Sequence, residues 1–222
     1  MGKNPIAVSL FDYTGNMLKP WLEAGYECHL LDIQHPARPT RRSDGMFCHP
    51  VDLSTPLDFK VRPAFVSAFP PCTHLAVSGA RWFRGKGLRA LQESIGFFAT
   101  AAEYCEQSGA PYIIENPVST ISTYWRKPDY SFHPHEYAGL ESGDNYTKKT
   151  CLWAGGGFVM PKHCLGVGKP DDRIHKCPPG PERANIRSAT PMGFARAVFE
   201  ANQPDWRAAR VIAEMNAGVR NG

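Results

Sequence analysis

The stretch IAVSLFDYTGNMLKPWLEAG, residues 6–25, contains the pattern from which the rest of the architecture can be inferred. Its first five residues are an apolar run typical of a buried strand, and Gly15 follows in a turn. Residues 17–24 have helical spacing, in which Pro20 is tolerated in the first turn and Gly25 ends the helix. A strand, a glycine turn and a helix in this order form the opening unit of an α/β sheet.

The same alternation continues along the chain. Apolar runs predict strands at 27–32, 64–68, 112–114, 131–137 and 150–153. A helix is expected over 88–108, with one apolar face made by Leu91, Ile95, Phe98, Ala102 and Cys105. Residues 189–218 return to helical spacing, broken near Pro204. We therefore expect a doubly wound, Rossmann-like α/β sheet, in which ligands bind at the carboxyl ends of the strands.

The composition is that of an ordinary globular domain. Of 222 residues, 42% are hydrophobic and 21% are charged, and no apolar run is long enough to cross a bilayer. The first residues do not have the pattern of a signal peptide, so a cytoplasmic location in a bacterial or phage-infected cell is expected. The seven cysteines are an odd number without a secretion signal, which favours buried thiols over a disulfide framework.

The net charge of +4 permits contact with nucleic acid without requiring it. The basic residues are clustered. For Arg38, Arg41 and Arg42 we favour solvated surface, whereas the basic, glycine-containing stretch 81–87 is expected to be a mobile loop.

Polar and reactive side chains follow several of the expected strands. The turn at 11–16 would let a ligand approach the backbone, and Asp32 stands at the distance along the chain where an acid binds ribose hydroxyls. This turn has one glycine rather than a dinucleotide fingerprint, so a purely structural turn stays an alternative.

Two further motifs carry chemistry. Cys72 follows a central strand in the rigid turn Phe69-Pro70-Pro71, where a thiolate would be presented as a nucleophile. A buried structural cysteine is the alternative. Glu115 ends another strand at the same edge, where a carboxyl can hold or protonate a heterocycle nitrogen. Its alternatives are a helix-capping or a salt-bridged acid.

The order and spacing of these motifs resemble the cytosine-5 DNA methyltransferases, in the compact form of phage-type members. The resemblance covers roughly residues 6–200. It is carried by FDYTGN at 11–16 with WLEAGY at 21–26, FPPCTHLAVSG at 69–79, ENP at 115–117, and RSAT at 187–190 followed by Arg196.

The resemblance implies an S-adenosylmethionine-dependent methyltransferase fold. Residues 1–157 would form the catalytic core, 158–186 a much reduced target-recognition region, and 187–222 the C-terminal helices that complete the core. S-adenosyl-L-methionine would be the cofactor and double-stranded DNA the partner, with no membrane and no obligate protein partner.

The resemblance also implies roles for single residues. Cys72 would attack carbon 6 of a flipped cytosine, Glu115 would contact ring nitrogen 3, and Asn116 would position the cysteine turn. Lys149 would contact the carbonyl oxygen of the base. The cofactor would be bound by Phe11, Gly15, Asn16, Asp32 (ribose), Asp52 (adenine) and Pro70.

Departures from the family pattern leave alternatives open. Tyr13 and Asn16 stand where the family usually has glycine, and Lys19 could pair with a carboxylated form of S-adenosylmethionine, giving carboxymethylcytosine; an exposed Lys19 without this role is favoured. An RNA acceptor and a catalytically inactive DNA-binding protein are further alternatives. The last motif of the family, an Asn in a final segment that faces the cofactor, has no convincing counterpart in residues 208–222.

The short region at 158–186 contains two histidines and two cysteines. Their spacing is not that of a zinc finger, so no metal is predicted and loop residues are favoured. These residues are His163, Cys164, His175 and Cys177.

Overall fold

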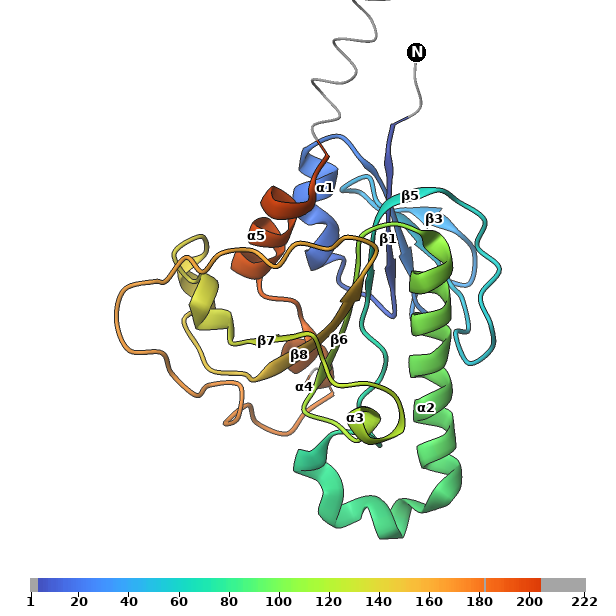
Figure 1. Cartoon of the computed structure of the whole chain (residues 1–222), viewed down its shortest axis with the longest axis vertical. Coiled ribbons are helices and arrows are strands. Elements are labelled where there is room, and N and C mark those ends of the chain that lie inside the picture. Colours follow the sequence, from blue (N-terminus) through green and yellow to red (C-terminus); the bar gives the residue numbers. More distant parts are fainter. Residues whose placement is uncertain (1–3, 182, 205–222) are drawn as a thin grey trace, which may run out of the picture.

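The computed structural model describes residues 4–181 and 183–204. Eight strands form one sheet in the order β3-β4-β2-β1-β5-β6-β8-β7 (Figure 1). The strands are β1 Ile6–Leu10, β2 Glu27–Leu31, β3 Thr40–Arg41, β4 Phe47–His49, β5 Pro63–Ala68, β6 Tyr112–Pro117, β7 Tyr130–Phe132 and β8 Thr150–Gly155.

Five neighbouring strands, from β4 through β2, β1 and β5 to β6, are parallel. β8 runs antiparallel to both β6 and β7, and the short β3 forms an antiparallel edge on β4. The strand order reverses direction between β1 and β5, which is the switch point where doubly wound sheets bind ligands. The expected doubly wound, Rossmann-like α/β architecture is thus confirmed.

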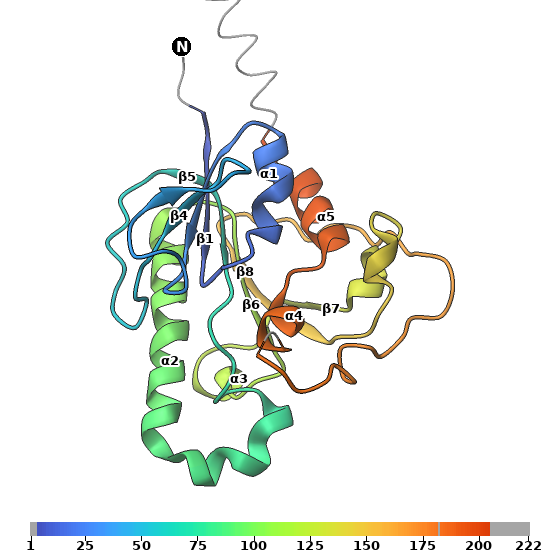
Figure 2. The same cartoon turned by 180° about the vertical axis from the view of Figure 1, so that it is seen from behind.

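Helices cover both faces of the sheet. α2 lies on one face, and α1 and α5 lie together on the other (Figures 1 and 2). The helices are α1 Lys19–Glu23, α2 Phe83–Ser108, α3 Ile121–Tyr124, α4 Arg183–Ser188 and α5 Met192–Asn202, with 3-10 turns η1 Asn16–Leu18, η2 Val77–Trp82, η3 Pro134–Tyr137 and η4 Ser142–Asp144.

The strands are apolar on both sides because both faces of the sheet are covered. Along β1, Ala7 packs in the cluster beneath α1 and α5, whereas Val8 and Leu10 pack in the cluster beneath α2. Trp21 of α1 stacks on Phe65 of β5 at a ring-centroid distance of 4.6 Å. These contacts fix α1, and with it the turn that precedes it, against the sheet.

Two expected elements differ in the structure. The strand predicted at 131–137 ends at Phe132, because Pro134 lacks a backbone N–H and begins η3. The stretch 81–87, expected to be a mobile loop, is helical: it spans the end of η2 and the first turn of α2. Only Gly87 departs from helical geometry there, with φ 79° and ψ 175°.

Within the stretch 158–186, which was expected to be loop, residues 158–181 contain no named helix or strand, whereas α4 begins at Arg183. Backbone contacts anchor it, including the N–H of Gly139 to the carbonyl of Cys164 at 2.8 Å and a bridge between Tyr146 and Asp171. The helix predicted to reach residue 218 is α5 as far as Asn202. Gln203 and Pro204 are not helical, and residues 205–222, which include the stretch 208–222, lie outside the described residues.

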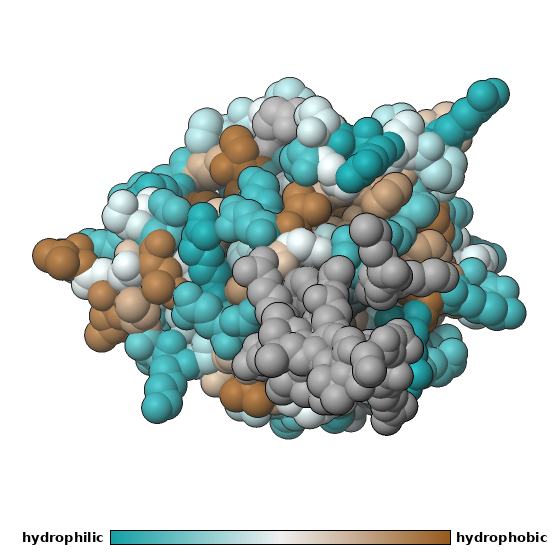
Figure 3. Space-filling view, turned by 90° about the horizontal axis from the view of Figure 1, so that it is seen from above, coloured by the Kyte–Doolittle hydropathy of each residue, from teal (hydrophilic) through white to brown (hydrophobic). Residues whose placement is uncertain are grey.

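The surface where the strands begin mixes residue types. In the coloured part of the view from above, hydrophilic residues separate the hydrophobic ones into small groups (Figure 3). None of the helices formed by the described residues combines the length and the apolar character that a membrane span requires.

Candidate active site

The candidate residues gather at the carboxyl ends of the parallel strands. Asp12 follows β1, Asp32 follows β2, Cys72 follows β5, and Glu115 lies near the end of β6. β1, β2, β5 and β6 are neighbours in the sheet, so its topology brings these side chains to one edge. This is the edge at which the sequence placed the site.

The turn that carries Cys72 is fixed by hydrogen bonds. The side-chain Nδ2 of Asn116, which is 1% exposed, donates to the carbonyl oxygen of Pro70 at 2.9 Å. The N–H groups of Leu75 and Ala76 donate to the carbonyl of Cys72 at 3.0 and 2.9 Å. The half-buried Cys72 is therefore held in one position relative to β6.

Glu115 and Cys72 share one electrostatic environment. Burial raises the pKa of Glu115, and Lys148, whose Nζ lies 3.9 Å from Oε1, opposes that rise. Burial also raises the pKa of the Cys72 thiol, with a further rise from the Glu115 charge, while Lys148 and Arg187 lower it. Glu115 Oε1 is buried and accepts no hydrogen bond within the described residues. An acid held this way favours its protonated form.

Lys149 was expected to contact the carbonyl oxygen of the base; the lysine that lies beside Glu115 is its neighbour, Lys148. Lys148 is half-buried, whereas Lys149 is exposed and acts electrostatically on His133 and Cys151. A cavity of about 10 Å³ beside Glu115 and Lys148 is lined by Phe69, Glu115, Phe132, Lys148, Thr150, Ser188, Thr190, Pro191 and Phe194.

Asp12 shapes the turn after β1, a role that the sequence reading missed. Its buried carboxylate accepts hydrogen bonds from the hydroxyl of Ser9 at 2.8 Å, the hydroxyl of Thr14 at 3.1 Å and the N–H of Gly15 at 2.7 Å. Ser67 of β5 donates to Ser9 at 2.9 Å, which joins β5 to the same network. The pattern Asp-x-Thr-Gly, with a side-chain acceptor just before a glycine, was the signal available in the sequence.

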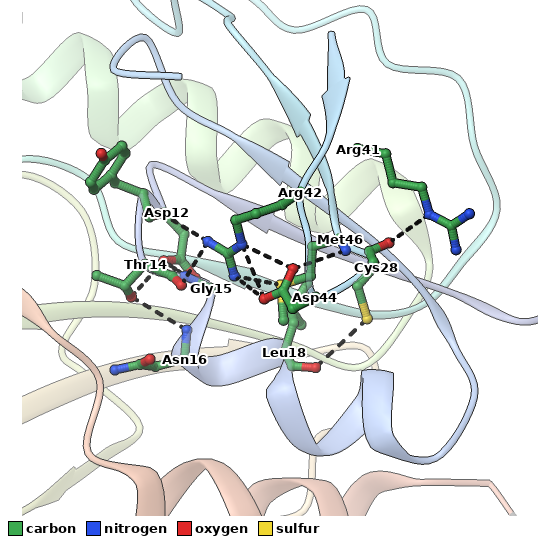
Figure 4. Close-up of polar contacts among 12 residues, drawn as sticks. Asp12, Thr14, Gly15, Asn16, Leu18, Cys28, Arg41, Arg42, Asp44 and Met46 are labelled. Carbon is green, nitrogen blue, oxygen red and sulfur yellow. Dashed lines mark hydrogen bonds and ion pairs between the residues drawn. The ribbon is translucent and has the colours of Figure 1, made fainter. Parts of the chain in front are cut away.

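Arg42 holds the other side of this turn (Figure 4). Its Nη1 donates to the carbonyl of Thr14 at 3.1 Å and reaches that of Tyr13 at 3.5 Å. Its Nε and Nη2 bind both carboxylate oxygens of Asp44 at 2.7 to 3.0 Å. Arg38, Arg41 and Arg42 were interpreted as solvated surface; Arg38 and Arg41 are exposed, whereas the hairpin of β3 and β4 brings the half-buried Arg42 over the turn.

Gly15 is required by packing. Its φ is +73°, and a Cβ there would lie 2.7 Å from the sulfur of Met46, 2.8 Å from Leu30 and 3.0 Å from Arg42. The bare side of this glycine thus faces protein atoms. The next residue, Asn16, donates from its side chain to the carbonyl of Thr190 at 3.2 Å, which joins the turn to the late RSAT motif.

The residues expected to bind the nucleoside part of a cofactor lie along the same edge. Asp32 is 7% exposed, accepts the N–H of Gln34 at 2.8 Å, and forms no ion pair within the described residues. Burial raises its pKa. Phe11, in a left-handed conformation with φ 54°, packs edge-on against Phe97, and Asp52 is exposed beyond β4. A buried acid without a cationic partner suits sugar hydroxyls, so these residues fit a nucleoside.

No metal centre is formed by the residues described. Among them, no group of three or more His, Cys, Asp or Glu side chains lies together as metal ligands would. His163 instead lies 3.9 Å from Glu136, and its ring packs edge-on against Tyr137.

Comparison with known proteins gives weak structural similarity alone. No protein-family model and no curated protein matches the chain. Among solved structures, the glycopeptide N-methyltransferase MtfA is similar over 69% of this chain and 66% of its own, at 13% identity and a TM-score of 0.29. The complex of MtfA with (S)-adenosyl-L-homocysteine is similar over 74% of this chain and 59% of its own, at 15% identity and a TM-score of 0.29. Its complex with (S)-adenosyl-L-methionine is similar over 70% of this chain and 61% of its own, at 13% identity and a TM-score of 0.26.

The matched part spans less than two thirds of each MtfA chain. Function is therefore inferred from the strand order and from the side chains at the carboxyl edge of the sheet.

Proposed function

We propose that this protein is an S-adenosylmethionine-dependent enzyme that modifies carbon 5 of cytosine in DNA through a covalent adduct with Cys72. The observation that supports the proposal most is the bond from Asn116 to the Pro70 carbonyl, because it fixes the cysteine turn of β5 beside the acid on β6. The charge of Glu115 acts on the pKa of the Cys72 thiol, and the two residues follow or end neighbouring strands, so we expect both side chains to act on one planar ring.

Glu115 would act as the proton donor to the ring. Its burial favours the protonated carboxyl, as the raised pKa indicates. A protonated carboxyl can donate to ring nitrogen 3 of cytosine, which withdraws electrons from carbon 6 and makes it electrophilic. The side chain of Glu115 is 15% exposed, and its buried Oε1 is the carboxyl oxygen shielded from water.

Cys72 would act as the nucleophile. When Glu115 is neutral, its contribution to the raised pKa of Cys72 disappears, and the positive charges of Lys148 and Arg187 remain to favour the thiolate. The thiol proton leaves to solvent, a bond forms between sulfur and carbon 6, and the electron pair of the 5,6 double bond makes carbon 5 nucleophilic.

When bound, S-adenosylmethionine would supply an electrophilic methyl group to carbon 5 and leave as S-adenosylhomocysteine. Loss of the proton from carbon 5 to solvent then restores the 5,6 double bond, the bond between carbon 6 and sulfur breaks, and Cys72 is released as the thiolate. The proton on ring nitrogen 3 returns to Glu115. Asp32 would accept hydroxyls of the cofactor's ribose, Asp52 would reach its adenine, and Phe11 and Pro70 would line the space between them.

DNA containing 5-fluorocytosine tests this chemistry. Fluorine at carbon 5 cannot leave as a proton, so the adduct persists and adds the mass of the oligonucleotide to the protein. We expect the adduct on wild-type protein in the presence of S-adenosylmethionine, mapped to Cys72 and absent from Cys72→Ala. Cys164→Ser, at another half-buried cysteine, should keep the adduct.

An adduct on a different cysteine, or none on DNA, would contradict the proposal. An adduct formed on fluorinated RNA alone would assign the same chemistry to an RNA acceptor.

A further inference from the structure

Asn16 joins the turn after β1 to the segment that precedes α5. Its side-chain Nδ2 donates to the carbonyl oxygen of Thr190 at 3.2 Å, across 174 positions of the sequence. The backbone N–H of Asn16 donates to the hydroxyl of Thr14 at 3.3 Å, and that hydroxyl donates to the carboxylate of Asp12. The position of the Asn16 side chain therefore depends on the same network that shapes the turn.

The acceptor of this bond belongs to the wall of the cavity beside Glu115. Thr190 is 8% exposed and lines that cavity next to Pro191, and Lys148 is also in the lining. Phe69, which follows β5 and leads into the cysteine turn, lines the cavity too. Thr190 thus contacts the turn proposed for the cofactor and borders the place proposed for the base.

Two side chains hold the segment 190–193. Asn16 binds it at Thr190, and the buried carboxylate of Asp144 accepts the N–H of Gly193 at 2.7 Å. This second end is closely packed, because a Cβ on Gly193 would meet the carbonyl oxygen of Tyr137. Asp144 belongs to η4 and Asn16 to η1, so of these two bonds the one from Asn16 connects the segment to the cofactor turn.

We propose that Asn16 is a positioning residue that couples binding of S-adenosylmethionine to binding of the cytosine. The cofactor, packed against the turn 11–16, favours the arrangement in which Asn16 is bonded to Thr190, and this bond fixes the wall of the cavity. Such coupling is reciprocal, so each ligand raises the affinity for the other by the same factor. The inference rests on the proposed function for the identity of the two ligands.

A purely structural link between η1 and α5 predicts a different result. Packing already joins these elements, because Met17 and Leu18 lie in the same buried cluster as Ala195 and Val198. If Asn16 only adds to this packing, loss of its bond lowers the unfolding temperature and leaves the coupling of the two ligands unchanged. The coupling factor therefore distinguishes a positioning residue from a structural one.

Dissociation constants of the full chain measure the coupling. S-adenosylhomocysteine, which has no methyl group to transfer, is titrated by calorimetry with and without DNA. A fluorescein-labelled duplex with one unpaired cytosine is titrated by anisotropy with and without S-adenosylhomocysteine. In the wild-type chain each ligand should tighten binding of the other about 3- to 10-fold, which is the range of one neutral hydrogen bond.

Variants of Asn16 should lose this factor. Asn16→Asp keeps the shape of the side chain and removes the N–H donor, so the affinity ratio should fall to about 1. Asn16→Ala, which introduces no charge, should do the same. Asn145→Ala is the matched control and should keep the wild-type factor. Asn145 also donates from Nδ2 to a distant carbonyl, that of Val167 at 3.3 Å, and it does not line the cavity.

A wild-type coupling factor in both Asn16 variants would overturn the inference, as would a wild-type chain that binds the two ligands independently. If either result comes with an adduct on 5-fluorocytosine DNA, the chemistry proposed for Cys72 stands without the coupling. Coupling that depends on Asn16 in a chain that forms no adduct would keep the inference and refute the chemistry. A wild-type chain that binds neither ligand would overturn both.

Discussion

Asn116 donates its side-chain N–H to the carbonyl oxygen of Pro70 at 2.9 Å, and this bond connects two adjacent strands at the point where the proposed chemistry occurs. Pro70 has no N–H of its own and precedes a second proline, so the turn cannot be fixed by an ordinary backbone ladder. The buried amide of Asn116 takes that place. Cys72 is thereby positioned by β6 as much as by the strand it follows.

Asn116→Ala should separate positioning from folding. It leaves a buried carbonyl unpaired, which costs about 1–3 kcal/mol of stability, and it frees the cysteine turn, which should lower kcat up to about 100-fold. Asn202→Ala is the matched control, since Asn202 is also a buried amide bonded to backbone, at Val159 and Val198. Chemical denaturation and single-turnover methyl transfer check the two effects. An equal loss of kcat in both variants would contradict the positioning role.

The two adjacent lysines should differ sharply. Lys148 lowers the pKa of both Glu115 and Cys72, so Lys148→Ala should raise the pKa of the thiol and shift the rising limb of the pH–rate profile to higher pH. Lys149→Ala, at the exposed neighbour, should leave the profile in place. A shift caused by Lys149→Ala instead would contradict the role given to Lys148.

Glu115 should make stability depend on pH. Its pKa is raised in the folded chain, so the folded state holds this proton more tightly than the unfolded state does. Stability associated with the group is therefore present below the ordinary pKa of about 4.3 and is lost as pH rises toward the folded pKa. Glu115→Gln cannot ionise, so its unfolding temperature relative to wild type should rise between pH 4 and 7. A constant difference over that range would show that the acid is not destabilised by burial.

Arg42 should control affinity for the cofactor. It holds the carbonyls of Tyr13 and Thr14, so Arg42→Ala should loosen the turn after β1 and weaken binding of S-adenosylmethionine about tenfold in calorimetry. DNA affinity should not change. Arg41→Ala removes the same charge from the exposed neighbouring residue and should bind cofactor like wild type. Equal affinities of Arg42→Ala and Arg41→Ala for S-adenosylmethionine would contradict this role of Arg42.

The central strands were predictable because both faces of the sheet are covered. Residues 6–10 form β1 with the bounds read from the apolar run, and residues 27–32, 64–68 and 112–114 fall on β2, β5 and β6. Their carboxyl ends then placed Asp32, Cys72 and Glu115 at one edge. A strand that is buried on both faces has a nearly continuous apolar run, and such a run can be recognised in the sequence without knowledge of distant contacts.

Other features depend on contacts distant in sequence. Gly85 and Gly87 suggested a loop over residues 81–87, where the chain is helical, because an exposed helix carries no apolar periodicity. Arg42 was taken for surface because its partners, Tyr13 and Thr14, lie nearly thirty residues earlier in the chain. The choice between Lys148 and Lys149 depends on how the chain enters β8, which no local pattern specifies.

Nucleoside mass spectrometry on DNA from cells that express the wild-type chain or Cys72→Ala tests the covalent role of Cys72 most directly. We expect 5-methylcytosine in DNA from the wild-type cells and none in DNA from cells with the variant. A heavier cytosine that also depends on Cys72 would keep the nucleophile and change the transferred group. No modified cytosine in DNA from wild-type cells, or 5-methylcytosine that persists in Cys72→Ala, would contradict the account.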